Sequence, residues 1–325
     1  MCSATTVRSV CPVALLSQVV LSGRVRLSDL SATDGLQLSA CIIGMCTAPA
    51  QNCVLLVDAN WFGSEGRVLR VSLAEKRVEQ CLIRVPHTDA HVSDVQLLPG
   101  GTHIALALYR NGKENGYSHI VRLFAESQLN AWPVAHEFCL DTTSPGNIIY
   151  SPQLCVSRNL LLCTAPVHSR LVALEVTRDS KLVQTGAVQF NSAPTALCAF
   201  TACNDQLVAT AHADRTVRLW CHVETAAAAR CTFALEECSR VSVDTTCFRL
   251  ISSAAGLLLQ PESEQPTTAR LYRTDGTRLD APLLQPQLGQ LKLLCGCADG
   301  LNVLAYDRES ESLLTLEKRG SNAKH

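Results

Sequence analysis

The sequence contains 325 residues, of which 47% are hydrophobic, and its 28 basic and 29 acidic side chains give a formal net charge of −1. This composition is that of a well-buried globular chain. The charge balance argues against nucleic-acid binding, which would need a basic stripe on one face. No apolar run reaches the roughly 18 residues that a membrane span requires, so we expect no such span.

The first residues admit two interpretations. Arg8, Arg24 and Arg26 occur with no acidic residue before Asp29, a composition found in secretory signals and organellar transit peptides. Residues 25–28, however, carry a strand pattern that recurs along the chain. We therefore expect two strands of a first repeat here and retain organellar targeting as the alternative.

A strand-like pattern of alternating β-branched and apolar residues recurs throughout the chain. Its copies end at residues 28, 72, 124, 174, 220, 272 and 306, which are 44, 52, 50, 46, 52 and 34 residues apart. Repeats of this length with several strands each are typical of β-propeller blades, which bury their faces only against neighbouring blades.

No Pro/Gly/Ser-rich linker divides the chain. We therefore predict an all-β fold, a single β-propeller over residues 1–319 followed by a polar tail at 320–325. Seven blades of four antiparallel strands fit the seven copies, with six blades as the alternative. The ring would be closed by residues 5–10, by residues 313–317, or by both.

The clearest copy is LVATAHADRTVRLWCHVE, residues 207–224. An apolar strand is followed by a tight turn, in which Asp214 can bond the backbone two residues on, and by a β-branched strand that ends at Trp220. Such a short connection predicts an antiparallel hairpin. No Ser or Cys nucleophile accompanies His212, Asp214 and Trp220, so we interpret them as a structural staple and not as a catalytic triad.

The stretch ATAHADRTVRLWC resembles the second half of a WD40 repeat. Asp214 matches the turn aspartate of that family, Trp220 matches its tryptophan, and Thr210 stands near its Ser/Thr position. The resemblance implies a hydrogen-bonded network that staples the blade, completed by a histidine before the approach strand. Asn-Ser at 191–192 replaces that histidine here, whereas His91 is a candidate in another unit. The chain thus resembles a degenerate WD40-repeat propeller.

Three connections within the predicted hairpins are long, and together they carry the candidate partner-binding residues. They comprise residues 58–67, 109–119 and 260–269, and in a propeller they emerge on one face of the ring. Binding residues concentrate on loops of rigid scaffolds, and aromatic residues are enriched at binding hot spots. The candidates are Trp61, Phe62, Tyr109, Arg110, Lys113 and Tyr117. The alternative is that these loops are tolerated surface excursions whose aromatic rings fold back onto the blades.

The 17 cysteines are scattered and form no Cys-x-x-Cys pair. Zinc sites need two such pairs, or Cys with paired His, so we expect no metal site and no cofactor. Several cysteines lie in strand-like patterns, where a free thiol behaves as a small buried hydrophobe; these are Cys41, Cys53, Cys163, Cys198 and Cys247. An odd count without an N-x-S/T sequon favours a reducing compartment, the cytoplasm or the nucleus.

Two classes of function remain. We expect a non-catalytic scaffold, a WD40-like subunit that binds other proteins in a complex, because no catalytic motif is recognisable and this is the usual role of the family that the chain resembles. The alternative is a propeller hydrolase or lactonase with its active site at the mouth of the central channel. That enzyme would need convergent acid–base groups, for which the scattered candidates are Asp58, Asp94, His91 and Glu114.

Overall fold

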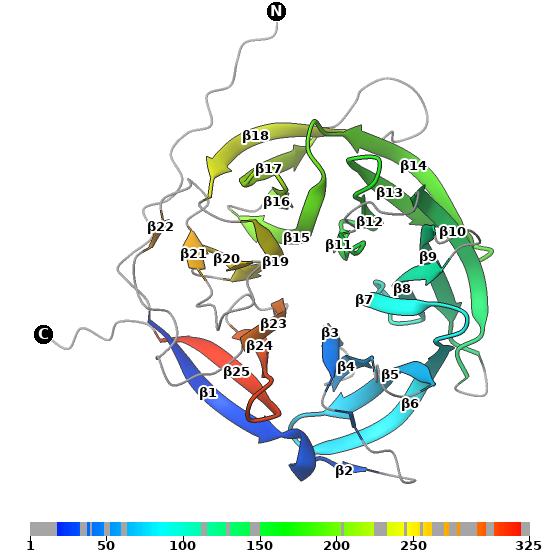
Figure 1. The fold of residues 1–325 in the computed structure, drawn as a ribbon, viewed down its shortest axis with the longest axis vertical. Coiled ribbons are helices and arrows are strands. Elements are labelled where there is room, and N and C mark those ends of the chain that lie inside the picture. Colours follow the sequence, from blue (N-terminus) through cyan, green and yellow to red (C-terminus); the bar gives the residue numbers. More distant parts are fainter. Residues whose placement is uncertain are drawn as a thin grey trace, which may run out of the picture.

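The computed structural model is a ring of β-sheets (Figure 1). It describes residues 18–32, 38–39, 41–48, 53–59, 64–111, 116–127, 131–143, 150–202, 205–223, 233–243, 246–253, 256–261, 270–272, 278–279, 291–296 and 302–319. In these ranges the only helix is a single 3-10 turn, η1 (Leu27–Asp29). None of the described segments forms a helix long and apolar enough to cross a membrane.

The described strands form six sheets, which we number by their order along the chain. The first sheet contains β3 (Ile42–Ala48), β4 (Cys53–Asp58), β5 (Glu65–Ser72) and β6 (Arg77–Pro86), with the short β2 (Ser31–Ala32) added in parallel to β6. The second contains β7 (His91–Leu97), β8 (His103–Asn111), β9 (Tyr117–Ala125) and β10 (Val134–Thr143). The third contains β11 (Leu154–Ser157), β12 (Leu160–Ala165), β13 (Arg170–Val176) and β14 (Leu182–Gln189).

The other three sheets complete the ring. The fourth contains β15 (Pro194–Ala202), β16 (Asp205–His212), β17 (Thr216–His222) and β18 (Leu235–Ser242). The fifth contains β19 (Cys247–Ser253), β20 (Gly256–Pro261), β21 (Arg270–Tyr272) and β22 (Arg278–Leu279). The sixth contains β23 (Leu291–Gly296), β24 (Asn302–Asp307), β25 (Ser312–Arg319) and, as its fourth strand, β1 (Gln18–Arg26).

The first strand of each sheet faces the centre of the ring. These inner strands contact one another in the order β3, β7, β11, β15, β19, β23 and back to β3 (Figure 1). The core lies between adjacent sheets, as where Leu55 and Val57 of the first sheet pack with Leu106 and Leu108 of the second. Because both faces of a sheet are covered, a central strand such as β4 is buried at every position, and its sequence is apolar throughout except for its last residue, Asp58.

The predicted seven blades are not supported, because two of the seven copies of the strand pattern belong to one sheet. Residues 25–28 lie at the end of the outer strand β1 and in η1, and residues 303–307 lie in β24, the second strand of the same sheet. In the other five sheets the copies lie in the third strand, namely β5, β9, β13, β17 and β21. The unusually short final interval of 34 residues reflects this change of strand.

The ring is closed by pairing of the two chain ends. Strand β1 runs antiparallel to β25, with Gln18 opposite Arg319 and Arg26 opposite Ser312. Of the closing segments that we predicted, residues 313–317 lie in β25, whereas residues 5–10, like the tail at 320–325, lie outside the described residues. After β1, the side chain of Leu27 packs in one cluster with Leu313.

The hairpin of β16 and β17 contains a chain of hydrogen bonds through buried side chains. Trp220 Nε1 donates to Thr210 Oγ1 at 2.8 Å. The same oxygen lies 2.8 Å from His212 Nε2, and His212 Nδ1 lies 3.1 Å from Ser192 O. A carbonyl only accepts, so His212 Nδ1 carries a proton. Burial lowers the pKa of His212 to about 4, so the ring is neutral at neutral pH and its Nε2 accepts from the Thr210 hydroxyl.

Asp214, which the WD40 resemblance assigns to this network, instead fixes the turn. Its carboxylate accepts hydrogen bonds from Thr216 N at 3.1 Å, from the Thr216 hydroxyl at 2.6 Å and from Arg218 Nη2 at 2.9 Å. The histidine of the network comes from the end of β16 and reaches back to Ser192, one of the two residues that stand where the family has its histidine. The sequence predicted His212 as part of a structural staple with Asp214 and Trp220, but it did not predict that His212 would supply the histidine of the network.

Replacement of Thr210 by valine tests the network. The change leaves the Trp220 N–H and His212 Nε2 without their partner, and each unsatisfied buried group costs about 1–3 kcal/mol. We expect the free energy of unfolding, measured by chemical denaturation, to fall by about 2–4 kcal/mol. The matched control is Thr185→Val, which removes a part-buried hydroxyl that donates to Ala173 O at 3.3 Å. An equal loss in the control would contradict the prediction.

The neutral His212 also predicts a pH dependence of stability. Its pKa is lowered from 6.5 to about 4 in the folded chain, so the unfolded chain binds the proton more readily. The corresponding stability is fully present above pH 6.5 and is lost as the pH falls towards 4. We expect the thermal midpoint of wild type to fall over this range and that of His212→Gln to fall less. Parallel curves for the two proteins would show that His212 does not carry the dependence.

Candidate functional site

Four partly exposed aromatic side chains gather at one end of the second sheet. The rings of His87 and His91 stack with their centroids 4.9 Å apart, and those of His91 and Tyr109 stack at 5.0 Å. Tyr117 meets Tyr109 edge-on at 6.5 Å. We call these four residues the aromatic cluster. It brings together two predicted partner-binding residues, Tyr109 and Tyr117, with His91, which we had assigned to a blade network, and with His87, which we had not identified.

Strand register explains the cluster. His91 of β7 pairs directly with Tyr109 of β8, so their side chains project from the same face. Tyr117 of β9 pairs with Asn111, two residues beyond Tyr109, and the two-residue period of a strand returns it to that face. His87 joins from the tight turn between β6 and β7. The cluster depends on how β7, β8 and β9 pair, and the sequence does not show this pairing. The sequence of the loops therefore predicted only Tyr109 and Tyr117.

Burial shapes the chemistry of the cluster. It raises the pKa of Tyr109 to about 12, with a smaller contribution from Tyr117. Burial also lowers the pKa of His91, as does the neighbouring His87. Tyr109 and His91 are therefore uncharged at neutral pH and present apolar ring faces with polar edges, a combination suited to protein interfaces.

Arg110 follows Tyr109 in β8, so strand alternation directs its side chain to the other face of the sheet, where it lies in a network of ion pairs. It contacts Asp89 and Glu137, each at 3.1 Å. The more buried Arg122 binds the same two carboxylates, at 2.7 and 2.8 Å. The hydrogen bond from Arg122 holds the pKa of Asp89 below its ordinary value, so the network remains charged. Arg110 is thereby fixed in position while 36% of its side chain stays exposed.

Described residues of two of the three predicted loops are connected through the aromatic cluster. His87 N donates to Ser64 O at 2.9 Å, which joins the turn before β7 to the segment 58–67, and the cluster itself frames the segment 109–119. Trp61, Phe62 and Lys113 lie outside the described residues, as does most of the segment 260–269. The aromatic cluster is therefore the part of the predicted binding surface for which the structure gives a geometry.

The centre of the ring is crossed by a buried ion pair. Arg249 of β19 contacts Asp94 of β7 at 3.3 Å, with 9% and 6% of the two side chains exposed. Arg249 also donates to Ile43 O of β3 at 2.8 Å, and Asp94 accepts from Leu154 N of β11 at 2.9 Å. The second and fifth sheets, which lie on opposite sides of the ring (Figure 1), are thus joined through its centre.

The candidates for an enzymatic centre each have a different partner. Asp58 is fully buried and binds Arg67 and the Ser39 hydroxyl. Asp94 binds Arg249, and His91 is stacked in the aromatic cluster. Glu114 lies outside the described residues. Within the described ranges, no three His, Cys, Asp or Glu side chains are grouped so that they could hold a metal ion.

The cysteines whose side chains are described carry free thiols. Of the five that we expected in strands, Cys53, Cys163, Cys198 and Cys247 are buried, and Cys41 is partly exposed. Burial raises the pKa of Cys247 to about 12 and that of Cys163 well above its ordinary value. These thiols stay protonated and act as small apolar side chains, since the thiolate is the reactive form.

No family model matches this chain, and no curated protein matches its sequence. Several solved structures resemble this chain in fold. A putative 6-phosphogluconolactonase from Bacteroides fragilis has a TM-score of 0.57 and 15% identity over 87% of this chain and 81% of its own. The β-propeller domain of Cps50 (Swd1) from Myceliophteria thermophila has a TM-score of 0.55 and 9% identity over 93% and 99%.

A glucose dehydrogenase has a TM-score of 0.55 and 13% identity over 92% of this chain and 100% of its own. At such identities the likeness concerns the fold alone, and it extends both to proteins named for an enzymatic activity and to one named for its propeller domain. Together with the ring of sheets, these comparisons show that the chain is a β-propeller.

Proposed function

We propose that this β-propeller is a non-catalytic scaffold that binds partner proteins through the end of the ring where the aromatic cluster lies. The observation that carries the proposal is the ladder of four partly exposed rings, His87, His91, Tyr109 and Tyr117, with the fixed Arg110 on the other face of the same sheet. Tyr and Arg are the residues most enriched, with Trp, at the energetic centres of protein interfaces.

Rigidity of the cluster favours this role. Three of the rings stand on paired strands, and Arg110 is held by two carboxylates. A side chain already fixed loses little rotamer entropy when a partner covers it, so more of the contact energy appears as affinity. Ser64, in the described part of the segment 58–67, contacts the turn that carries His87.

The finer assignment is to a WD40-like subunit of a multi-protein complex. It is supported by the hydrogen-bonded chain from Trp220 through Thr210 to His212, which uses residue types that the WD40 resemblance implies. The free, protonated thiols are compatible with a reducing compartment, and we place the protein in the cytoplasm or nucleus on that basis.

The alternative, a propeller hydrolase or lactonase, is supported by the likeness in fold to a putative 6-phosphogluconolactonase. Acid–base chemistry at the ring centre would need a free carboxylate. Asp94 is instead neutralised by Arg249, and Asp58 by Arg67. We therefore favour the scaffold.

The double variant Tyr109→Ala/Tyr117→Ala tests the proposal. Tagged wild type and variant are used to purify partners from native extract, and the captured proteins are quantified by mass spectrometry. We expect wild type to retain a stoichiometric set of proteins and the variant to retain at least about tenfold less, because truncating an interface centre costs about 2 kcal/mol or more.

The matched control is Tyr109→Phe/Tyr117→Phe, which keeps the rings and removes only their hydroxyls. We expect it to retain the partners, and the thermal midpoints of both variants establish that the ring is folded. If wild type captures nothing in stoichiometric amount, or if the folded alanine variant captures as much as wild type, the scaffold function at this surface is wrong.

A further inference from the structure

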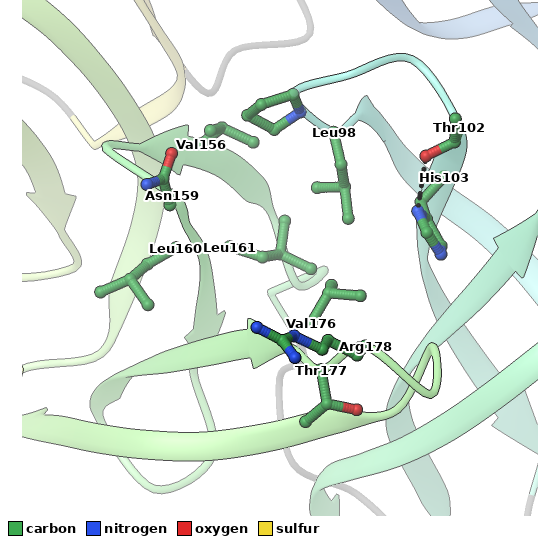
Figure 2. A pocket seen from close by; sticks show the side chains of 11 residues that line it. Leu98, Thr102, His103, Val156, Asn159, Leu160, Leu161, Val176, Thr177 and Arg178 are labelled. Atoms are coloured by element: carbon green, nitrogen blue, oxygen red, sulfur yellow. Dashed lines mark hydrogen bonds between the residues drawn. The ribbon is translucent and has the colours of Figure 1, made fainter. Parts of the chain in front are cut away.

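A cavity of about 390 Å³ lies between the second and third sheets (Figure 2). It is found at the end of β7 opposite to the aromatic cluster, since β7 begins at His91 and continues into Leu98 at the cavity. The turns after β7, β11 and β13 surround it. Its lining residues are Leu98, Pro99, Thr102, His103, Val156, Asn159, Leu160, Leu161, Val176, Thr177 and Arg178.

Aliphatic residues make up six of the eleven that line the cavity. Leu98 and Leu161 are buried, and Figure 2 shows their side chains and that of Val176 in the space between the two sheets. The turn after β7 is tight, because Gly100 and Gly101 adopt φ of +90° and +72°, which glycine tolerates without strain. These features form a preorganised apolar surface of the kind that small-molecule sites use.

Most polar groups at the cavity are already engaged. His103 Nδ1 lies 3.0 Å from Thr102 Oγ1, and His103 Nε2 lies 2.9 Å from the Ser180 hydroxyl. Burial lowers the pKa of His103, so its ring is neutral. Thr177 Oγ1 accepts from Lys181 N at 3.2 Å. Ser180 itself is not a lining residue, so the Ser180–His103 pair fixes the wall and presents no nucleophile to the cavity.

Arg178 and Asn159 differ from these groups. Among the described residues neither side chain makes a hydrogen bond or ion pair, and both are exposed at the rim. With His103 neutral, Arg178 is the one charged residue among the eleven that line the cavity. An aliphatic wall with a single cation and an amide at its edge matches a ligand that has an apolar body and one negative group.

We propose that this cavity binds a small amphipathic carboxylate. The aliphatic body lies against Leu98, Leu161 and Val176, and the carboxylate accepts hydrogen bonds from Arg178, with the Asn159 amide as a second donor. A guanidinium matches a carboxylate with two parallel N–H···O bonds, which are stronger than bonds between neutral groups. The volume lies within the range of small-molecule sites, about 300–1,000 Å³. This site is independent of the proposed partner-binding surface.

The experiment titrates the full chain, with ¹³C-labelled Leu and Val methyl groups, against octanoate, octan-1-ol and octylammonium by NMR. We expect saturable shifts at the methyl groups of Leu98, Leu161 and Val176 with octanoate. The alcohol, which has the same body without the charge, binds about tenfold more weakly, since a charge-assisted hydrogen bond contributes about 1.5–3 kcal/mol. Octylammonium binds more weakly again, because Arg178 repels it.

Two arginine variants locate the charge. Arg178→Gln lowers the affinity for octanoate about tenfold, to that of the alcohol. Arg158→Gln is the matched control, because Arg158 is exposed in the neighbouring turn and does not line the cavity, and it leaves the affinity unchanged. The proposal is overturned by the absence of saturable shifts at these methyl groups, by equal affinities for octanoate and octanol, or by equal effects of the two variants.

Discussion

The ion pair between Asp94 and Arg249 is the contact on which the arrangement of the sheets depends. Each of its charges also bonds a backbone group, Asp94 at Leu154 and Arg249 at Ile43, so a single pair joins the inner strands of four sheets. Both groups are buried, and a buried charge whose partner is removed costs several kcal/mol. Loss of either Asp94 or Arg249 would therefore leave the other charge buried and unpaired at the centre of the ring.

The two ends of β7 carry different features, on either side of Asp94. At its start, His91 joins a ladder of partly exposed rings, whereas beyond its end Leu98 lines the cavity between the second and third sheets. Asp94, between them, anchors the strand to the opposite side of the ring. A partner protein at one end and a small ligand at the other would thus share one strand whose position is set by the ion pair.

Features that depend on residues close together in the sequence could be predicted from it. Features that depend on contacts between distant residues could not. The hairpin that ends at Trp220 follows from alternation and a tight turn, and β16 and β17 have that form. The seven-blade count fails because alternation cannot distinguish an outer strand such as β1 from an inner one. Tyr109 and Tyr117 were identifiable from their loop, but His87 was not. Arg249 and Asp94 are 155 residues apart, and no local pattern connects them.

Closure of the ring by β1 and β25 also determines when the fold can be completed. The second to fifth sheets are each built from strands consecutive in sequence, so they can form as the chain is synthesised. Strand β1 is made before its partner β25, and Gln18 cannot pair until Arg319 has been synthesised. At about 5–20 residues per second, this interval of roughly 300 residues lasts on the order of 15–60 s. Throughout that time β1 is an unpaired edge, open to wrong pairing, and the length of the exposure is set by the ribosome and not by the stability of any sheet.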